Sequence, residues 1–254
     1  MKNSIIITGD FKEKYLARTI LSCLKQTLKP DEIILIYNSL ANENLLKQRF
    51  KKKIKFIKTK EKIKNPVQDQ LNKIKTALKY CSGKIIFLCD GDDIFIKNKI
   101  KIINCYLNNQ NEIFLHNFRI KKNKKIYSIP NKTYKKNYFY KKFFNCWPDK
   151  ISTSSIVISK KRLIYFFKFH KILRFKFLAV DALLCIFYQK NIRLINNILT
   201  IKNENDYNRV DLYYTSYFKN YVSRRIEQHE YYTLIHKEKK KLEYLVLRFI
   251  NYFI

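Results

Sequence analysis

Glycine and proline are scarce in this sequence, which contains 3 Gly and 4 Pro in 254 residues. Sandwiches and barrels built on many tight turns need these residues at their turns, so their scarcity favours helices with strands between them. The chain is long enough for one sizeable core. Its 46% hydrophobic and 15% aromatic residues exclude a disordered chain, whose apolar content is lower.

The cysteines form no CxxC pair and do not cluster with the four histidines, so a zinc site is not expected. Several lie in apolar runs, which predicts buried free thiols in a reducing compartment. No apolar run approaches the roughly 20 residues of a spanning helix, and the run in "MKNSIIITGD" is too short for a signal peptide. We therefore expect a cytoplasmic protein. The cysteines are Cys23, Cys81, Cys89, Cys105, Cys146 and Cys185.

Acidic residues are also few, with 20 Asp plus Glu against 53 Lys plus Arg and a formal net charge of +33. Such a charge suggests an anionic partner: nucleic acid, an acidic membrane surface or a phosphorylated substrate. Lys greatly outnumbers Arg, however, and Arg is the better ligand for phosphates and bases. Drift under AT-rich coding explains this composition equally well, so both interpretations stay open.

Short apolar runs alternate with amphipathic stretches in the first half of the chain. Pro30 follows the first amphipathic stretch, and Gly83 is expected to end the later one. Ile-rich strands that alternate with helices predict βαβ units and a mostly parallel sheet covered on both faces. The expected strands are 4–8, 32–37, 54–58 and 84–89, and the expected helices are 12–27 and 68–83.

The second half is expected to continue the same domain and to end in helices. Its pattern predicts a helix at 99–109, a strand at 112–118, a basic aromatic insert at 119–147, a strand and helix at 153–163, and an apolar helix at 177–190. We expect residues 1–210 to form one domain, with a nucleotide-binding half (1–98) and an acceptor side (99–210). Residues 211–254 would then form a basic helical extension.

The loop "CDGDDIF" places Asp90, Asp92 and Asp93 directly after an apolar strand, where Gly91 allows a sharp turn. Ligands of open α/β sheets bind outside the carboxyl ends of the strands. Carboxylates held there suit Mg²⁺ or Mn²⁺, whose other ligands are phosphates and water. The alternative is a helix start capped by Asp92 or Asp93, but a cap explains one or two acids and not three.

Three segments in order resemble family 2 glycosyltransferases with the GT-A fold. The first is "SIIITGDFKEKYLARTILSCLKQTLKPDEIILIYNS", with its "QT" before the second strand, and the second is "GKIIFLCDGDDIFIKNKI". The third is "STSSIVISKKRLI" followed by "AVDALLCIFYQKNIRLI", which is similar to the acceptor-side strand and its acidic motif. The resemblance spans about residues 4–200. It implies a Rossmann-like α/β fold with a mostly parallel central sheet flanked by helices.

The resemblance implies a role for each matching acid. Asp92 would bind Mn²⁺ or Mg²⁺, and Asp90 would lie beside the metal and the ribose or donor sugar. Asp93 matches an acid that is more often a helix cap than a ligand. Asp181 would be the general base that deprotonates an acceptor hydroxyl for inverting transfer. From the residues alone, Asp181 could instead be an N-cap.

The chain departs from the family where the nucleotide base is usually bound. Thr8 and Asp10 stand in the turn after the first strand and Asn38 in the turn after the second, and these are the expected nucleotide-binding residues. Asn offers both a donor and an acceptor where Asp offers acceptors only, so a uridine donor does not follow. Lys75, at a position usually occupied by Asn, could contact the diphosphate or face solvent, and we expect it to face solvent. Val180 replaces a Glu before the expected base.

Two basic regions suggest further partners. The 119–147 insert mixes Lys with Tyr and Phe, as nucleic-acid-binding surfaces do, but no nucleic-acid-binding motif is present and no such partner is expected. Trp147 could stack on an acceptor sugar or pack in the core. The tail "KEKKKLEYLVLRFINYFI" predicts a helix on an anionic membrane surface, at the inner face, or one packed on the domain or in a homodimer.

Together these patterns favour an inverting, metal-dependent glycosyltransferase that moves a hexosyl or related group. The donor would be a nucleotide-diphosphate-sugar. The acceptor would be a hydroxyl of a glycan or lipid-linked glycan, as in surface polysaccharide synthesis. The alternatives are a basic protein that binds nucleic acid or another polyanion, and a catalytically degenerate family member.

Overall fold

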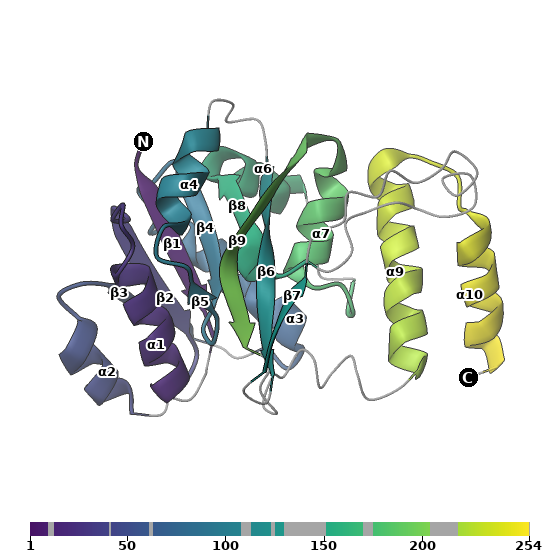
Figure 1. Cartoon of the computed structure of the whole chain (residues 1–254). Helices are drawn as coiled ribbons and strands as arrows, with labels where there is room; N and C mark the ends of the chain where they lie inside the picture. The colour runs from purple at the N-terminus through teal and green to yellow at the C-terminus, as the bar shows by residue number, and fades with distance from the viewer. Residues whose placement is uncertain are drawn as a thin grey trace.

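The computed structural model describes residues 1–9, 13–40, 42–60, 63–107, 113–122, 125–129, 151–169, 175–203 and 218–253. A single sheet runs through the centre of the molecule in the strand order β3-β2-β1-β4-β8-β6-β9-β5, with β7 beside β6 (Figure 1). The strands are β1 (Asn3–Thr8), β2 (Glu32–Tyr37), β3 (Lys55–Lys58), β4 (Ile85–Asp90), β5 (Ile94–Phe95), β6 (Ile113–Lys122), β7 (Lys125–Ile129), β8 (Ile156–Ser159) and β9 (Ile192–Asn203).

The sheet has a parallel half and a mixed half. Strands β3, β2, β1 and β4 are parallel, which confirms the four strands expected from the alternating pattern. Strand β8 is antiparallel to β4 and to β6, whereas β9 pairs parallel with β6 and antiparallel with β5. Strand β4, which carries the acidic loop at its end, therefore lies in the middle of the sheet.

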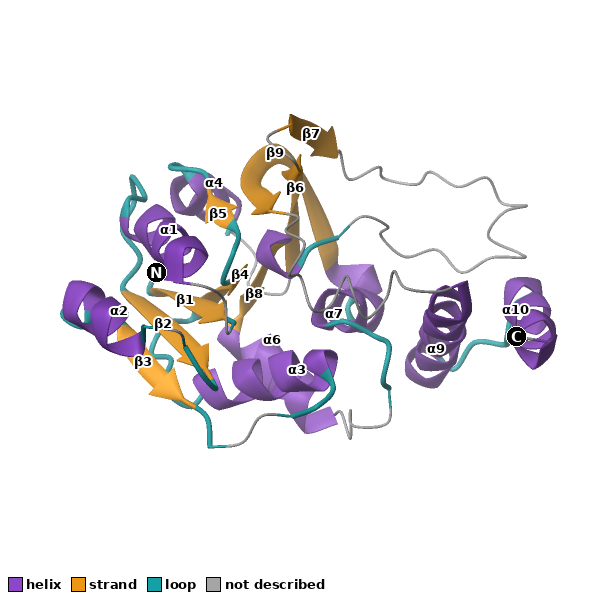
Figure 2. Ribbon diagram, turned by 90° about the horizontal axis from the view of Figure 1, so that it is seen from below, coloured by secondary structure: helices purple, strands orange, loops and turns teal. Residues whose placement is uncertain are grey.

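Helices cover both faces of the sheet, as the Ile-rich strands predicted. Figure 2 shows α1, α2 and α4 on one face and α3 and α6 on the other. The helices are α1 (Glu13–Leu24), α2 (Glu43–Phe50), α3 (Pro66–Ala77), α4 (Lys99–Tyr106), α6 (Lys160–Phe169), α7 (Val180–Phe187), α9 (Phe218–His236) and α10 (Leu242–Phe253).

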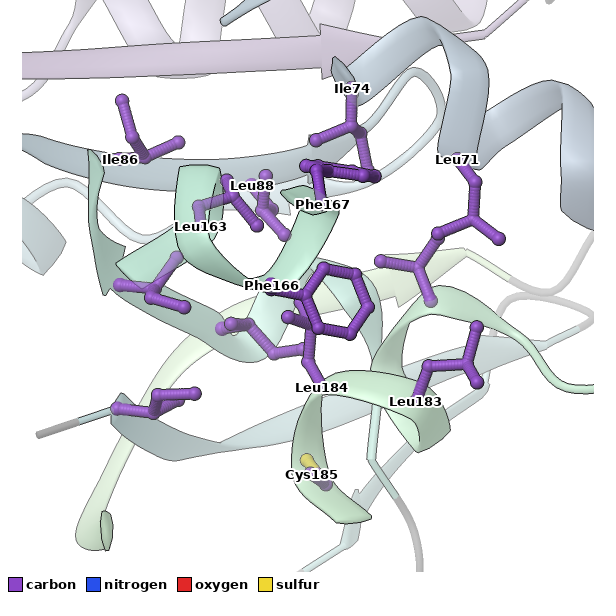
Figure 3. Close-up of a cluster of buried hydrophobic side chains, with 14 of the residues drawn as sticks. Leu71, Ile74, Ile86, Leu88, Leu163, Phe166, Phe167, Leu183, Leu184 and Cys185 are labelled. Carbon is purple, nitrogen blue, oxygen red and sulfur yellow. The ribbon is translucent and has the colours of Figure 1, made fainter. Parts of the chain in front are cut away.

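The core consists of two apolar layers, one on each side of the sheet. All six residues of β1 are buried, because alternate side chains enter opposite layers. Figure 3 shows the layer in which Leu71 and Ile74 of α3 meet Leu88 of β4 and Phe166 of α6. The layer also includes Leu184 of α7. These contacts fix α3 and α7 relative to the end of β4, where the candidate site lies.

The glycines correct one boundary expected from the sequence. Helix α3 ends at Ala77, so Gly83 does not terminate it. Gly83 instead precedes β4 and lies against β1, where a Cβ atom would stand 2.2 Å from Ser4 Oγ. Gly9 has a φ of 151°, which favours glycine, whereas Gly91 has no positive φ. Close approach and a turn therefore account for Gly83 and Gly9, but not for Gly91.

The two carboxyl-terminal helices pack on one side of the domain. Tyr231 of α9 is fully buried and stacks edge-to-face with Phe175, with ring centroids 5.2 Å apart. Glu227 of α9 accepts hydrogen bonds from the backbone amides of Lys176 (2.9 Å) and Phe177 (2.7 Å). Helix α10 lies beyond α9 (Figure 1). Of the helices in the described ranges, none is long and apolar enough to span a membrane.

Candidate active site

The parallel strands bring three of the expected donor-site residues to one edge of the sheet. Thr8 ends β1, Asn38 follows β2, and Asp90 ends β4. Backbone hydrogen bonds hold the three strand ends together, from Gly9 N to Ile36 O (3.3 Å) and from Gly91 N to Thr8 O (2.8 Å). Thr8 and Asn38 are 4% and 8% exposed. Asp10 lies outside the described residues, as do Trp147 and Cys146.

Asp90 is oriented by a residue that the sequence did not reveal. Gln70 of α3 donates from Nε2 to Asp90 Oδ1 (2.6 Å) and lies 3.5 Å from Thr8 Oγ1. The backbone amide of Asp90 donates to Ser154 Oγ (2.8 Å). Lys75, in contrast, is exposed on the same helix, as expected. The donor that faces the acidic loop thus comes from the first turns of α3, five residues before Lys75.

The helix-cap interpretation of Asp92 and Asp93 is wrong. Helix α4 begins at Lys99, several residues after the acids. Asp93 instead accepts a hydrogen bond at Oδ1 from the backbone amide of Asn203 (3.1 Å), and the Asn203 side chain donates to the Asp92 carbonyl. The end of β9 therefore holds the acidic loop in place. Asp92 and Asp93 are 4% and 1% exposed.

The acidic loop carries strong electrostatic repulsion. Burial raises the pKa of Asp90 well above its ordinary value, and the charges of Asp93, Asp92 and Asp181 raise it further, against the opposing effect of Lys202. Burial also raises the pKa of Asp93 to about 6. The influence of Asp181 on Asp90 shows that the fold brings the expected base within electrostatic reach of the acidic loop, although the two residues are far apart in sequence.

Asp181 lies at the start of α7 without capping it. The N-cap residue is Ala179, which makes no side-chain cap hydrogen bond, and Asp181 is in the first helical turn. Its Oδ1 accepts a hydrogen bond from the amide of Ala182 (2.7 Å), and the side chain is partly exposed. A carboxylate at a helix start is favoured by the helix dipole. The neighbouring Val180 is fully buried, so it belongs to the core.

A buried lysine, Lys99, contacts residues that hold the acidic loop in place. Lys99 is 0% exposed, and its Nζ donates to Ser154 O (2.7 Å) and Thr200 Oγ1 (3.1 Å). The ammonium group also lies 3.3 Å from the centroid of the Phe95 ring. Desolvation lowers the pKa of Lys99 to about 7. Lys99 therefore fixes Ser154, whose hydroxyl holds the Asp90 amide. The only sequence signal was a lysine among apolar helix positions, which usually indicates a solvent-facing residue.

The acidic loop fits a cation that is shared with a phosphate ligand. Within the described ranges, no group of three or more His, Cys, Asp or Glu side chains is arranged to hold a metal by itself. Mg²⁺ in nucleotide sites usually takes one or two carboxylates and completes its shell with phosphates and water. A cation beside Asp90 and Asp92 would relieve the repulsion that raises the pKa of Asp90. The donor set is therefore suitable for such an ion.

An α/β sheet with an acidic loop after a central strand, and a further carboxylate at a helix start nearby, defines a GT-A-type glycosyltransferase fold. The family model described as Glycosyl transferase family 2 matches residues 4–173. That match covers more than half of the chain, and the protein belongs to this family. Comparison of the sequence with curated proteins finds no match.

The fold is similar to crystal structures of S. aureus TarS. For TarS 1-349 in complex with UDP-GlcNAc, the TM-score is 0.66 at 14% identity, covering 98% of this chain and 73% of that one. For TarS 1-349 in complex with UDP, the TM-score is 0.63 at 15% identity, covering 99% and 70%. For the longer TarS structure, the TM-score is 0.61 at 14% identity, and this chain spans 39% of its length. At these identities the likeness concerns the fold.

Proposed function

We propose that the protein transfers a hexosyl or related group from a nucleotide-diphosphate-sugar to a hydroxyl of a glycan or lipid-linked glycan, with inversion at the anomeric carbon. The observation that carries this proposal is the cluster of mutually repelling carboxylates at the carboxyl end of β4, with Asp181 within electrostatic reach. Family membership and the UDP and UDP-GlcNAc complexes of the TarS structures support a nucleotide-sugar donor. Such a reaction suits the synthesis of a surface polysaccharide.

The donor would occupy the edge formed by the ends of β1, β2 and β4. Thr8 and Asn38 lie there, and Asp10, which is outside the described residues, remains an expected donor-binding residue from the sequence. Asn38 offers a carboxamide donor and an acceptor to the base edge. The diphosphate would then lie toward Asp90 and Asp92, because these acids require a cation and a cation in turn attracts phosphates.

In this proposal Asp92 and Asp90 hold Mn²⁺ or Mg²⁺. The ion, when bound, neutralises the charge that develops on the diphosphate leaving group. The protein's own contribution is to hold the loop rigid. Gln70 orients Asp90, and Asn203 ties both Asp92 and Asp93 to β9. Rigid carboxylates reduce the entropy that is lost when the ion and donor bind.

Asp181 would act as the general base. It takes the proton of the acceptor hydroxyl as that oxygen bonds to the anomeric carbon, while the bond from that carbon to the diphosphate oxygen breaks and the nucleoside diphosphate leaves. A sugar hydroxyl is a poor nucleophile until a base accepts its proton, and such assistance is worth about 10²–10⁴-fold in rate. The partial exposure of Asp181 at the start of α7 keeps its carboxylate accessible to an acceptor.

A thermal-shift screen tests the donor and the metal together. The full chain is heated with UDP, GDP, dTDP and CDP and with a sugar conjugate of each, with and without Mn²⁺. We expect one nucleoside diphosphate and its sugar to raise the Tm, and to do so only with Mn²⁺, because ligands that bind the native state stabilise it. The variant Asp92→Asn should lose this shift.

Asp31→Asn is the matched control, because Asp31 lies at the opposite edge of the sheet and accepts a hydrogen bond from Asn3 N (2.7 Å). It changes the net charge equally and should keep the ligand shift. A protein that merely binds polyanions would behave differently. Its binding to nucleic acid would fall steeply with salt and would not change in Asp92→Asn, and that pair of results would contradict the proposal.

A further inference from the structure

The outward face of α10 carries a continuous apolar stripe. Six large apolar side chains of this helix are between 49% and 85% exposed, and no polar residue interrupts them. They recur at spacings of three and four residues, which places them on one side of a helix with 3.6 residues per turn. The outer stripe, as we name it, consists of Leu242, Leu245, Val246, Phe249, Tyr252 and Phe253.

The opposite side of α10 already has a partner. Tyr244 is buried against α9, and Leu247 and Ile250 pack there with it. Glu243 forms an ion pair with Arg225, and its carboxylate lies 3.0 Å from His229 Nε2. These contacts determine how α10 is rotated about its axis. The outer stripe is therefore turned away from α9 by the packing of the inner side, and α10 itself lies on the far side of α9 from the sheet (Figure 2).

Exposed basic residues lie before the outer stripe and on one flank of it, with Glu238 among them. Lys237, Lys239 and Lys240 are exposed in the segment that joins α9 to α10, and Arg248 is exposed on α10 itself. Lys240 also donates to Tyr244 OH (3.0 Å), so its ammonium group stays at the start of the helix. An apolar stripe bordered by lysine and arginine, with aromatic residues within it, is typical of helices that lie in a membrane interface.

We propose that the outer stripe docks on an anionic lipid bilayer, with α10 lying in the plane of the interface. Its apolar side chains would enter the boundary between headgroups and acyl chains, while the nearby lysines and Arg248 contact anionic headgroups. The helix has 12 residues, fewer than the ~20 residues that a helix needs to span a bilayer. The proposal goes beyond glycosyl transfer and does not depend on it.

Charge favours a bilayer over a second copy of the chain as the occupant of this surface. A symmetric contact through the outer stripes would bring the same lysines and Arg248 of two molecules close together, since equivalent patches meet in such a contact. Each molecule already carries a formal net charge of +33. On an anionic bilayer the same basic residues face negatively charged headgroups, so the repulsion is replaced by attraction.

Vesicle flotation of the full chain tests the proposal without any substrate. Vesicles of phosphatidylcholine alone are compared with vesicles that also contain phosphatidylglycerol. We expect the protein to float with the anionic vesicles and to bind phosphatidylcholine at least tenfold more weakly. Phe249→Glu should reduce binding to anionic vesicles by about tenfold or more, because it removes a large apolar side chain and adds repulsion.

Phe169→Glu is the matched control, since Phe169 of α6 is 54% exposed and Phe249 is 67% exposed. It introduces the same change on another helix and should leave vesicle binding unchanged. Equal loss in both variants would show that net charge alone drives binding and would overturn the role of the outer stripe. Light scattering decides the other alternative: a dimer that Phe249→Glu dissociates, with no vesicle binding by the native chain, would make this surface an interface between copies.

Discussion

Two carboxylates at opposite ends of the parallel strands have pKa values shifted in opposite directions. Glu32 begins β2, and Asp90 ends β4. Burial alone would raise the pKa of Glu32, but hydrogen bonds from the Ser4 hydroxyl, the amides of Ser82 and Gly83, and Lys55 lower it to about 2. Burial raises the pKa of Asp90 well above its ordinary value, and neighbouring carboxylates add to the effect.

The difference lies in the donors that each carboxylate receives. Glu32 accepts from several groups of the protein, including Gly83 N (3.1 Å) and Lys55 Nζ (3.1 Å). Among the described residues, Gln70 is the one side chain that donates to the Asp90 carboxylate. The negative charge of Glu32 is stabilised by hydrogen-bond donors of the protein itself. The charge of Asp90 has fewer such donors, and a bound cation would supply the missing stabilisation. Stability and ligand binding should therefore respond differently to the loss of each charge.

The largest expected effect is on turnover, in Asp181→Asn. Asn keeps the size of the side chain but cannot accept a proton, so we expect the transfer rate to fall by about 10²–10⁴-fold. Binding of the donor with Mn²⁺, followed by thermal shift, should stay within about twofold because Asp181 is not expected to contact the diphosphate. If the variant retains full activity, Asp181 is a residue of the helix start and another group is the base.

Glu32→Gln should reduce stability while sparing ligand binding. The lowered pKa means that the charged form is favoured in the native state, and we expect a loss of about 2–3 kcal/mol at pH 7. The folded pKa is about 2 against an ordinary value of 4.5, so the contribution of Glu32 is present above pH 4.5 and disappears as the pH falls toward 2. Urea unfolding at several pH values measures this, and an unchanged profile in the variant would contradict it.

Asp93→Asn should raise the free energy of unfolding, whereas Glu32→Gln should lower it. Burial raises the folded pKa of Asp93 to about 6, above its ordinary value of 3.8. Its charge therefore destabilises the metal-free protein increasingly as the pH rises through that interval. With the charge removed, we expect the metal-free protein to gain about 1–2 kcal/mol at pH 7. Urea unfolding in the presence of a chelator tests this. A loss of stability would mean that Lys99 and Lys202 compensate Asp93 fully.

The fold was predictable where local pattern decides it. The first four strands and the helices α1 and α3 follow from apolar periodicity, since buried parallel strands need continuous apolar runs, whereas α2 (Glu43–Phe50) was not expected. The pattern did not reveal β9 (Ile192–Asn203), whose outer positions are polar and exposed, or its pairing with β5. Strand pairing between distant segments depends on tertiary contacts that no local window contains.

The acids of the candidate site stand out in the sequence, whereas the residues that hold them in place do not. The acids stand out because a carboxylate after a buried strand has no obvious structural use. The residues that hold the acids in place do not stand out from their neighbours in the sequence. Asn203 ends a strand that contains several polar residues, and Gln70 is one of several polar residues in α3. The family resemblance pointed to Lys75 in this helix, and Lys75 is exposed. The structure assigns the contact to Gln70, because the direction of the side chain is set by how α3 packs on the sheet.

The smallest expected effect sharpens the comparison at Asp90 itself. Gln70→Leu removes its side-chain donor, at 2.6 Å, so the carboxylate should bind protons more readily and orient less well toward the cation. We expect the donor and Mn²⁺ to bind about five- to tenfold more weakly, as the loss of one ordinary hydrogen bond, about 1–1.5 kcal/mol, predicts. Isothermal titration calorimetry measures the affinity. Lys75→Ala, an exposed change on the same helix, should leave it unaltered. If both variants bind the donor as the native chain does, the orientation of Asp90 depends on its backbone contacts with Ser154 alone.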